Sequence, residues 1–300
     1  MGSGTWVSKA FANYTSTTKG MSMDDFSNAR GLSAQSIYKS RHLSDVLNPK
    51  NVMRECCDSE EHPHTLPVIL ALDVTGSMGG SAVKVAQKLN QIMTDLYADD
   101  TIQDIEFCVM GIGDLAYDEA PIQMSQFESD IRIAEQLDAI YFERGGGGNS
   151  YESYSAAWYM GVNHCKLDCW NRGEKGIIIT LGDELPNPHL PIKGYAGLAE
   201  VTGDKLQGDV ETTELLKEAQ NKFNIYHISV DDPDSSYEYN QRRYDLDDSW
   251  KKLLGEDHYF VSGLDGLPKT IVNIIQNRDN TPVITSGTKM NVTENNEVCW

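Results

Sequence analysis

The most constraining feature of the chain is a continuous apolar run at residues 66–72 (LPVILAL), which ends directly in the polar loop at residues 73–80 (DVTGSMGG). An apolar run of this length, bounded by turn residues, is typical of a strand buried on both faces, as in a parallel sheet. Residues 81–98 then place their apolar side chains at the spacing of an amphipathic helix. The core therefore begins with a strand, a polar glycine-containing loop and a helix.

The alternation of strand and helix continues along the chain. Further buried-strand patterns occur at residues 105–112, 175–181, 223–230 and 258–262, and a short proline-containing segment at 121–127 fits an antiparallel edge strand. Helical patterns occur at 127–140, from the glycine-rich loop at 144–152 to about residue 165, at 211–222 and at 264–276. We expect an α/β fold: a Rossmann-like, mainly parallel sheet of about six strands, with one antiparallel edge strand and helices on both faces.

The length of 300 residues suits one core domain with extensions. Residues 1–65 are polar, with helical hints at 23–29 and 33–47, and we expect an extension that wraps the core or awaits a partner. We assign residues 66–280 to the core domain and residues 281–300 to a polar C-terminal tail.

The charge balance argues against several classes of partner. The chain has 25 Lys and Arg against 45 Asp and Glu, a formal net charge of −20, and no basic run. Contacts to phosphate need clustered cations, so binding to nucleic acid or to an anionic membrane surface is disfavoured. No apolar stretch approaches the ~20 residues that span a bilayer, and the first residues lack the apolar segment of a signal peptide. The six cysteines are scattered, so we expect a cytoplasmic protein, of a bacterium or a phage.

Three polar loops are predicted to meet at the carboxyl edge of the sheet, where open α/β sheets bind ligands. The first loop carries Asp73, Thr75 and Ser77, the second Asn149, Ser150 and Glu152, and the third Asp183 and Glu184. Any one of these loops could be only a helix cap or a turn. Three of them at one edge favour a metal site instead.

The first loop has the spacing of an oxygen-rich ion site. In the pattern Asp-x-Thr-x-Ser, alternate side chains can point at one ion, and Gly76 permits a sharp turn. Mg²⁺ prefers about six oxygen ligands and commonly retains waters. We therefore predict a Mg²⁺ site, with Mn²⁺ or Ca²⁺ as alternatives, that leaves one position for a ligand. The predicted metal-site residues are Asp73, Thr75, Ser77, Asn149, Ser150 and Asp183.

Two of these segments resemble a known family. Residues 67–79 (PVILALDVTGSMG) are similar to the opening strand and the metal-ion-dependent adhesion site (MIDAS) motif of von Willebrand factor A (vWA) domains, which usually read Asp-x-Ser-x-Ser. Thr75 keeps the hydroxyl of the middle serine. Residues 176–186 (GIIITLGDELP) resemble the fourth strand of that family and the aspartate that follows it. The resemblance covers roughly residues 66–280 and implies a vWA fold in which Asp183 acts directly or through a water.

The second loop departs from the commonest family pattern. Many vWA domains have Gly-Gly-Thr-x-Thr there, whereas residues 145–153 read GGGGNSYES and place Gly148 or Asn149 at that point. The segment looks more like the Gly-Gly-Gly-Asp-x-Pro-Glu form of a subset of the family, in which Asn149 would match the Asp and Glu152 the Glu. Whether Asn149 or Ser150 faces the ion is left open.

The resemblance also implies a function. In vWA domains the metal does no chemistry, and a carboxylate from a partner protein completes its coordination. This implies a non-enzymatic, metal-dependent protein-interaction module, with intracellular members serving as adaptors for AAA+ ATPases or other large assemblies. The partner would present an acidic residue, and the N-terminal 65 residues are where we expect protein-specific contacts.

An enzyme is the alternative. Residues 73–78 (DVTGSM) are also similar to the Asp-x-Thr-Gly-Thr motif of haloacid dehalogenase-like phosphotransferases, in which Asp73 would be the phosphorylated nucleophile beside Mg²⁺. The segment GDELPN resembles their Gly-Asp-x-x-x-Asp motif, but Asn187 stands where the second acid belongs.

Other candidate sites are weaker. Cys56-Cys57 with His62 and His64, and His164-Cys165 with Cys169, could suggest zinc, but neither set has the Cys-x-x-Cys spacing of structural sites. We expect His62 and His64 to be solvated. Asp114 and Asp118 follow a strand and could form an outer shell around the metal. The acidic, aromatic stretch at 231–244 is interpreted as a solvated loop or, alternatively, as a partner contact.

Overall fold

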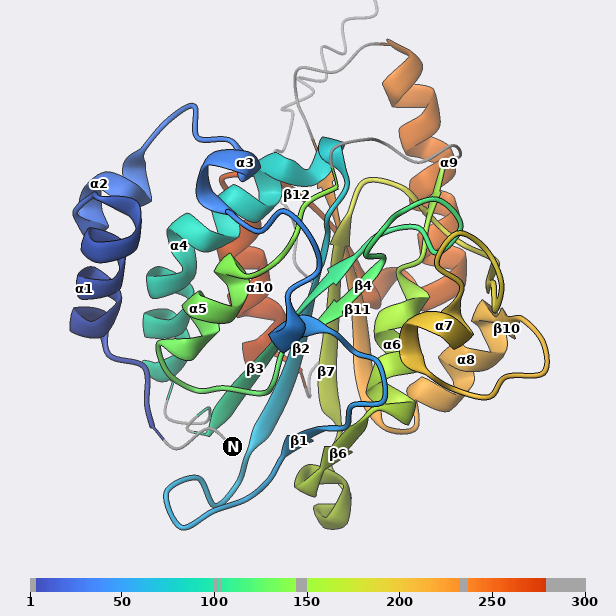
Figure 1. Ribbon diagram of the computed structural model, residues 1–300, viewed down its shortest axis with the longest axis horizontal. Helices are drawn as coiled ribbons and strands as arrows, with labels where there is room; N and C mark the ends of the chain where they lie inside the picture. Colours follow the sequence, from blue (N-terminus) through green and yellow to red (C-terminus); the bar gives the residue numbers. More distant parts are fainter. Residues whose placement is uncertain (1–3, 100–101, 103, 144–149, 232–236, 279–300) are drawn as a thin grey trace, which may run out of the picture.

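A six-stranded sheet forms the centre of the molecule. The structure, a computed structural model, describes residues 4–99, 102, 104–143, 150–231 and 237–278 (Figure 1). The sheet consists of β2 (Leu66–Asp73), β3 (Ile105–Ile112), β4 (Ile122–Met124), β7 (Gly176–Gly182), β11 (Phe223–Asp231) and β12 (Tyr259–Gly263). The strand order is β12-β11-β7-β2-β3-β4, and every neighbouring pair is parallel except β3 and β4. The predicted fold class, with its antiparallel edge strand, is confirmed.

Helices cover both faces of this sheet, which explains the unbroken apolar runs of its central strands (Figure 1). One face carries α4 (Gly79–Tyr97), α5 (Arg132–Asp138) and α10 (Leu267–Gln276), and the other carries α6 (Ser155–Asn163), α8 (Thr212–Ala219) and α9 (Tyr237–Leu254). The whole of β3 and β7 is buried, as is β2 after its first residue. The core therefore lies in two layers, one on each side of the sheet.

Short elements complete the chain. Among the described residues, three two-stranded pairs lie outside the main sheet: β1 (Arg54–Cys56) with β6 (Cys165–Leu167), β5 (Tyr151–Glu152) with β8 (Leu185–Pro186), and β9 (His189–Leu190) with β10 (Val210–Glu211). The other short helical elements comprise the 3₁₀ turns η1 (Asp45–Leu47), η2 (Gly76–Met78), η3 (Asp168–Arg172) and η4 (Glu256–His258), and the α-helix α7 (Leu198–Thr202).

The N-terminal extension packs on the core. It forms α1 (Ser8–Lys19), α2 (Met23–Asn28) and α3 (Ala34–Ile37), and all three contact α4 (Figure 1). The side chain of Gln87 on α4 donates hydrogen bonds to the carbonyl oxygens of Phe26 and Ala29, at 2.9 and 2.8 Å. Phe26 itself is buried in the same apolar cluster as α4. The extension thus shares the hydrophobic core of the sheet.

Two details of the sequence interpretation were wrong. The stretch at 231–244 is not a solvated loop over its described part, because Tyr237 begins α9, whose later turns bury Trp250 against the sheet. His62 is buried, with its Nδ1 atom 3.4 Å from Asp104, whereas His64 is exposed as predicted.

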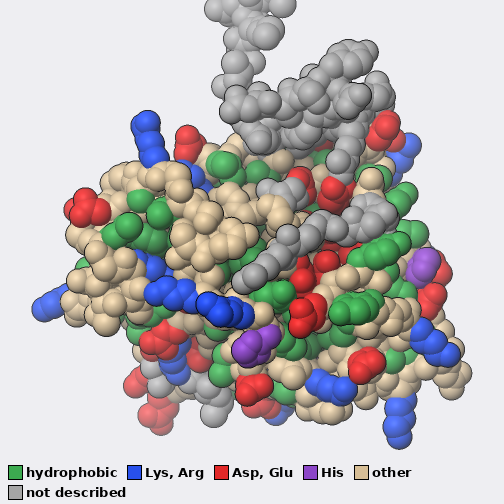
Figure 2. All heavy atoms as spheres, turned by 45° about the horizontal axis from the view of Figure 1, so that its top comes forward, with side chains coloured by type: hydrophobic (Ala, Val, Ile, Leu, Met, Phe, Trp, Pro, Cys, Tyr) green, Lys and Arg blue, Asp and Glu red, His purple; other side chains and the backbone are tan. Residues whose placement is uncertain are grey.

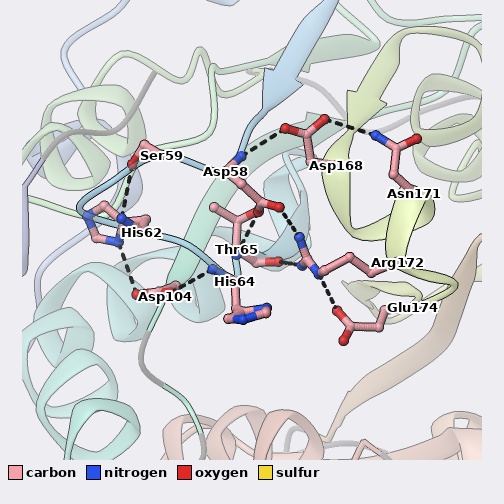
Figure 3. Close-up of polar contacts among 10 residues, drawn as sticks. All are labelled: Asp58, Ser59, His62, His64, Thr65, Asp104, Asp168, Asn171, Arg172 and Glu174. Atoms are coloured by element: carbon pink, nitrogen blue, oxygen red, sulfur yellow. Dashed lines mark hydrogen bonds and ion pairs between the residues drawn. The ribbon is translucent and has the colours of Figure 1, made fainter.

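Arg172 ties the segment before β2 to η3, near the amino ends of the strands (Figure 3). Its guanidinium donates to the carboxylate of Asp58, to the carbonyl oxygen of Thr65 at 2.9 Å and to Glu174 at 3.0 Å. Thr65 also donates to Asp58, through its amide at 3.1 Å and its hydroxyl at 2.8 Å. Burial acts to raise the pKa of Asp58, but the hydrogen bonds from Arg172 and Thr65 outweigh it and lower the pKa.

We predict that Arg172→Met lowers the free energy of unfolding by about 1–2 kcal/mol at pH 7, since it removes charge-assisted bonds that are only partly shielded from water. Because the pKa of Asp58 is lowered in the folded state, its stabilising effect holds above the unfolded-state pKa of about 3.9 and is lost as the pH falls through the folded value. Urea unfolding from pH 3 to 7 measures both effects.

The matched control is Lys166→Met. Lys166 pairs with Glu55 at 3.4 Å, and its side chain is 67% exposed. We expect this variant to change the stability by less than about 0.5 kcal/mol. An Arg172→Met variant as stable as the control at pH 7 would contradict the prediction.

Candidate functional site

The strand order creates a switch point at β2. The chain passes from β2 to β3 on one side, and β7 then pairs with β2 on the other side. Loops that leave the carboxyl ends of β2 and β7 therefore diverge around a crevice, the usual ligand position in an open α/β sheet. Asp73 is the last residue of β2, and Asp183 directly follows the last residue of β7. The two predicted acids flank the switch point.

Asp73 organises the first loop. Its side chain is only 1% exposed, and its Oδ1 atom accepts hydrogen bonds from the amide of Thr75 at 2.8 Å and from the hydroxyl of Thr75 at 2.5 Å. These two bonds turn the chain tightly into η2 and then into α4. The carboxylate and the hydroxyl are thereby held against each other at the strand end, with Thr75 also buried.

Tyr154, just before α6, joins all three loops. Its hydroxyl donates to Oδ2 of Asp73 at 2.8 Å and accepts from the amide of Glu184 at 3.2 Å. The ring is fully buried and lies beside the stacked rings of His227 and Trp250, at centroid distances of 5.1 and 5.6 Å. Sequence reasoning missed this residue, although a tyrosine soon after a glycine-rich loop was a visible signal.

Gly182 makes room for that tyrosine. A Cβ atom at this position would collide with the hydroxyl and ring carbons of Tyr154. The glycine of the Gly-Asp pair that ends β7 therefore has a steric role, and the aspartate after it stays next to Asp73.

A two-residue strand pair connects the second loop to the third. Tyr151 and Glu152 in β5 pair with Leu185 and Pro186 in β8. Beyond the pair, the amide of Asn187 donates to the carbonyl oxygen of Glu152 at 3.0 Å. The residues on either side of the crevice are thereby fixed by backbone bonds.

The site gathers buried carboxyl groups. Glu152 is 4% exposed, and its Oε2 atom has no hydrogen-bond partner within the described residues. Burial, followed by the charges of Asp73, Asp118, Asp114 and Glu184, raises its pKa to about 10. Burial and the charge of Asp183 likewise raise the pKa of Asp73 to about 7. Figure 2 looks onto this side of the molecule and shows a group of acidic side chains at its centre.

This donor set fits a hard divalent cation. Carboxylate and hydroxyl oxygens are what Mg²⁺ prefers, and an ion there would neutralise the repulsion and meet the unpartnered oxygen of Glu152. In the described part of the chain, no group of three or more His, Cys, Asp or Glu side chains is arranged to hold a metal.

The structure brings together some of the predicted site residues. Asp73 and Thr75 are in contact, and Asp183 is close enough for its charge to raise the pKa of Asp73. The backbone of Ser77 lies in η2, directly after them. Ser150 is exposed, and Asn149 lies outside the described residues. The ligand role of each residue stays a prediction.

Asp114 and Asp118 lie on the loop between β3 and β4, beside the second loop. Oδ2 of Asp118 accepts from the amide of Asp114 at 2.6 Å, and the amide of Leu115 donates to the hydroxyl of Ser153 at 3.1 Å. Burial is the main cause that raises the pKa of Asp118 to about 6. Because this loop is tied to Ser153, the two acids contribute negative potential around the crevice, as an outer shell would.

The zinc alternatives are not supported by the described residues. Both ring nitrogens of His164 are occupied, Nδ1 by the carbonyl oxygen of Val52 at 3.0 Å and Nε2 by Asp204 at 2.8 Å. Burial raises the pKa of the Cys56, Cys165 and Cys169 thiols, which disfavours the thiolate form that metals bind. These cysteines are free thiols.

The described part of the chain contains no helix that is both long and apolar enough to span a bilayer.

Comparisons with known proteins find similarity only at the level of structure. No family model and no curated protein sequence matches the chain. Among solved structures, the pilus adhesin SpaC from Lactobacillus rhamnosus GG matches with a TM-score of 0.47 and 14% identity, over 77% of this chain and 31% of that one. This chain therefore spans about a third of that adhesin.

Two further structures show similar values. The vWF domain of the type V pili tip protein Mfa5 from Porphyromonas gingivalis has a TM-score of 0.45 and 13% identity, over 71% of this chain and 95% of that one. Proximal thread matrix protein 1 from the mussel byssus, with a zinc-occupied MIDAS motif, has a TM-score of 0.42 and 13% identity, over 76% and 46%. Because these TM-scores are below 0.5, the fold assignment rests on the strand order described above.

We predict that Gly182→Ala destabilises the protein by about 2 kcal/mol or more, since the new methyl group displaces Tyr154 from a packed site. Gly208→Ala is the matched control, because nothing lies near a Cβ atom there. It should change the stability by less than about 0.5 kcal/mol. Thermal and urea unfolding of the two variants side by side provide the measurement, and equal stabilities would show that the crevice is looser than described.

Proposed function

We propose that the chain is a vWA-like, metal-dependent protein-interaction module with a MIDAS-type site at the switch point of the sheet. Asp73, Thr75 and Ser77 would hold Mg²⁺, with Asp183 acting directly or through a water and the second loop supplying a further oxygen from Asn149 or Ser150. The bound ion would supply a positive centre for a carboxylate of a partner protein. The chain's own residues bind and orient that ion and exclude water around it.

The observation that carries this proposal is the buried carboxylate crevice itself. Asp73 and Glu152 are almost fully buried, and burial, followed by the charges of other carboxylates, raises their pKa values. Buried charge of one sign is costly unless it is paired or binds a metal. A divalent cation satisfies this arrangement, and the hydroxyl of Thr75 beside Asp73 supplies a neutral ligand of the kind that leaves the ion with residual positive charge.

A binding role fits the site better than phosphoryl transfer. The phosphotransferase alternative needs a second acid at position 187, where Asn187 instead donates its side-chain amide to Ser153 at 3.0 Å. Both oxygens of Asp73 also accept hydrogen bonds, from Thr75 and Tyr154, which lowers the nucleophilicity of that carboxylate. We therefore propose a non-enzymatic adaptor within a larger assembly. The free thiols support the further proposal of a reducing, cytoplasmic location.

The first test is calorimetric titration of the metal-stripped protein with Mg²⁺ and Mn²⁺. We expect one saturable site in the wild type, and Asp73→Ala should weaken it by more than about 100-fold because the central carboxylate is gone. Asp95→Ala, on the exposed side of α4, is the control and should bind like the wild type. Phosphate release from an aryl phosphate by the wild type but not by Asp73→Ala would contradict the proposal and favour the phosphotransferase.

A second prediction concerns Glu152→Gln. In chelator, the variant should unfold within about 2 °C of the wild type, because the raised pKa of Glu152 already keeps this carboxyl protonated near pH 7. With saturating Mg²⁺, the stabilisation of the wild type should exceed that of the variant by about 1.4 kcal/mol, the equivalent of a tenfold loss of affinity. A difference that is the same with and without Mg²⁺ would show that Glu152 has only a structural role.

A further inference from the structure

A cationic pocket lies beside the metal loop. It has a volume of about 330 Å³ and is lined by Gln35, Tyr38, Lys39, Ser40, Arg41 and Phe142. Tyr38 and Phe142 form an apolar floor, with ring centroids 4.5 Å apart. Lys39 and Arg41 are exposed at this pocket, in a chain whose formal net charge is −20. Two cations at one hollow of such an acidic protein call for an explanation.

Two contacts place this pocket next to the proposed metal site. The amide of Glu143, the residue after Phe142, donates to the carbonyl oxygen of Val74 at 3.1 Å. Val74 lies between Asp73 and Thr75, so one wall of the pocket is one hydrogen bond away from the metal loop. A Cβ atom at Gly79, where α4 begins, would lie 3.2 Å from Ala34 of α3. Figure 2 shows Lys and Arg side chains on the same face as the central acidic group.

The segment that carries the two cations is held firmly. The hydroxyl of Tyr38 donates to the carbonyl oxygen of Ala82 in α4 at 2.7 Å, and that of Ser40 donates to the carbonyl oxygen of Ala139 at 2.9 Å. The ammonium group of Lys39 donates one hydrogen bond to the carbonyl oxygen of Thr18 at 3.2 Å. Arg41 has no hydrogen bond or ion pair within the described residues. A guanidinium can bind a carboxylate with two parallel bonds, and its planar shape means that less side-chain entropy is lost per hydrogen bond formed.

We propose that this pocket is a second contact for the partner and that the partner is an acidic peptide segment with two carboxylates. One carboxylate completes the metal site, and the other binds Arg41 and Lys39 over the floor made by Tyr38 and Phe142. This inference rests on the proposed function. It goes further by assigning specificity to the N-terminal extension, because the cations lie there and not in the core domain.

The experiment uses the full chain with Mg²⁺ and peptides that are acetylated and amidated, so that they carry no terminal charges. One series has two glutamates separated by zero to six glycines, and the matched series has glutamine in place of the second glutamate. At one or more spacings, the wild type should bind the two-glutamate peptide about threefold to tenfold more tightly than its glutamine match.

The double variant Lys39→Gln/Arg41→Gln should lose this gain but still bind Mg²⁺. The control Lys9→Gln/Lys50→Gln removes the same charge from exposed positions of the extension and should keep the gain. If Mg²⁺ binds but no spacing gives a gain, or if the gain persists without Lys39 and Arg41, the two-point contact is overturned and the metal site stands. If Mg²⁺ does not bind, the proposed function fails, and this inference fails with it.

Discussion

The hydrogen bond between Tyr154 and Asp73 is the contact on which the site depends. It joins the end of β2 to the start of α6, and the same hydroxyl accepts a hydrogen bond from the amide of Glu184, shortly after β7. The tyrosine is held in turn by the rings of His227 and Trp250, and the indole of Trp250 donates to the carbonyl oxygen of Glu184 at 3.1 Å. One buried side chain thus sets the geometry of three loops. There is room for it because Gly182 has no side chain.

This framework confines carboxylates that would otherwise separate. A folded protein tolerates a cluster of buried carboxylates when the rest of the structure is stable enough to hold them together. Clusters of this kind, which cost free energy of folding, are commonly found at functional sites. Here the central strands, buried on both faces, are the rigid part. The fold therefore holds these carboxyl groups together by itself, as the proposed cation site requires.

The sequence predicted the sheet well because continuous apolar runs have few alternatives in a chain of this size. It also placed Asp73, Thr75 and Asp183 at the carboxyl edge of the sheet, since each stands within three residues of the end of a predicted strand, while their role as metal ligands stays a prediction. Tyr154 was missed because it does not follow a predicted strand. The glycine-rich loop before it marks its position, but no local pattern says which loop its hydroxyl contacts. The helix α9 was missed because its first turns are polar, and its buried residues Leu246, Trp250 and Leu254 recur only every four positions near its end. His62 was misjudged because its neighbours are acidic and its partner, Asp104, is distant in sequence.

The pairing of β1 with β6 has a consequence for the boundaries of the folding unit. Arg54–Cys56 supplies a parallel partner for Cys165–Leu167, and α1 and α2 cover the outer side of α4. A fragment trimmed to begin at residue 66 would expose an unpaired backbone edge and an apolar helix surface at the same time, and both promote self-association. Fragments intended to remain monomeric should therefore start upstream of Trp6, whose indole donates to Asn90 at 3.0 Å.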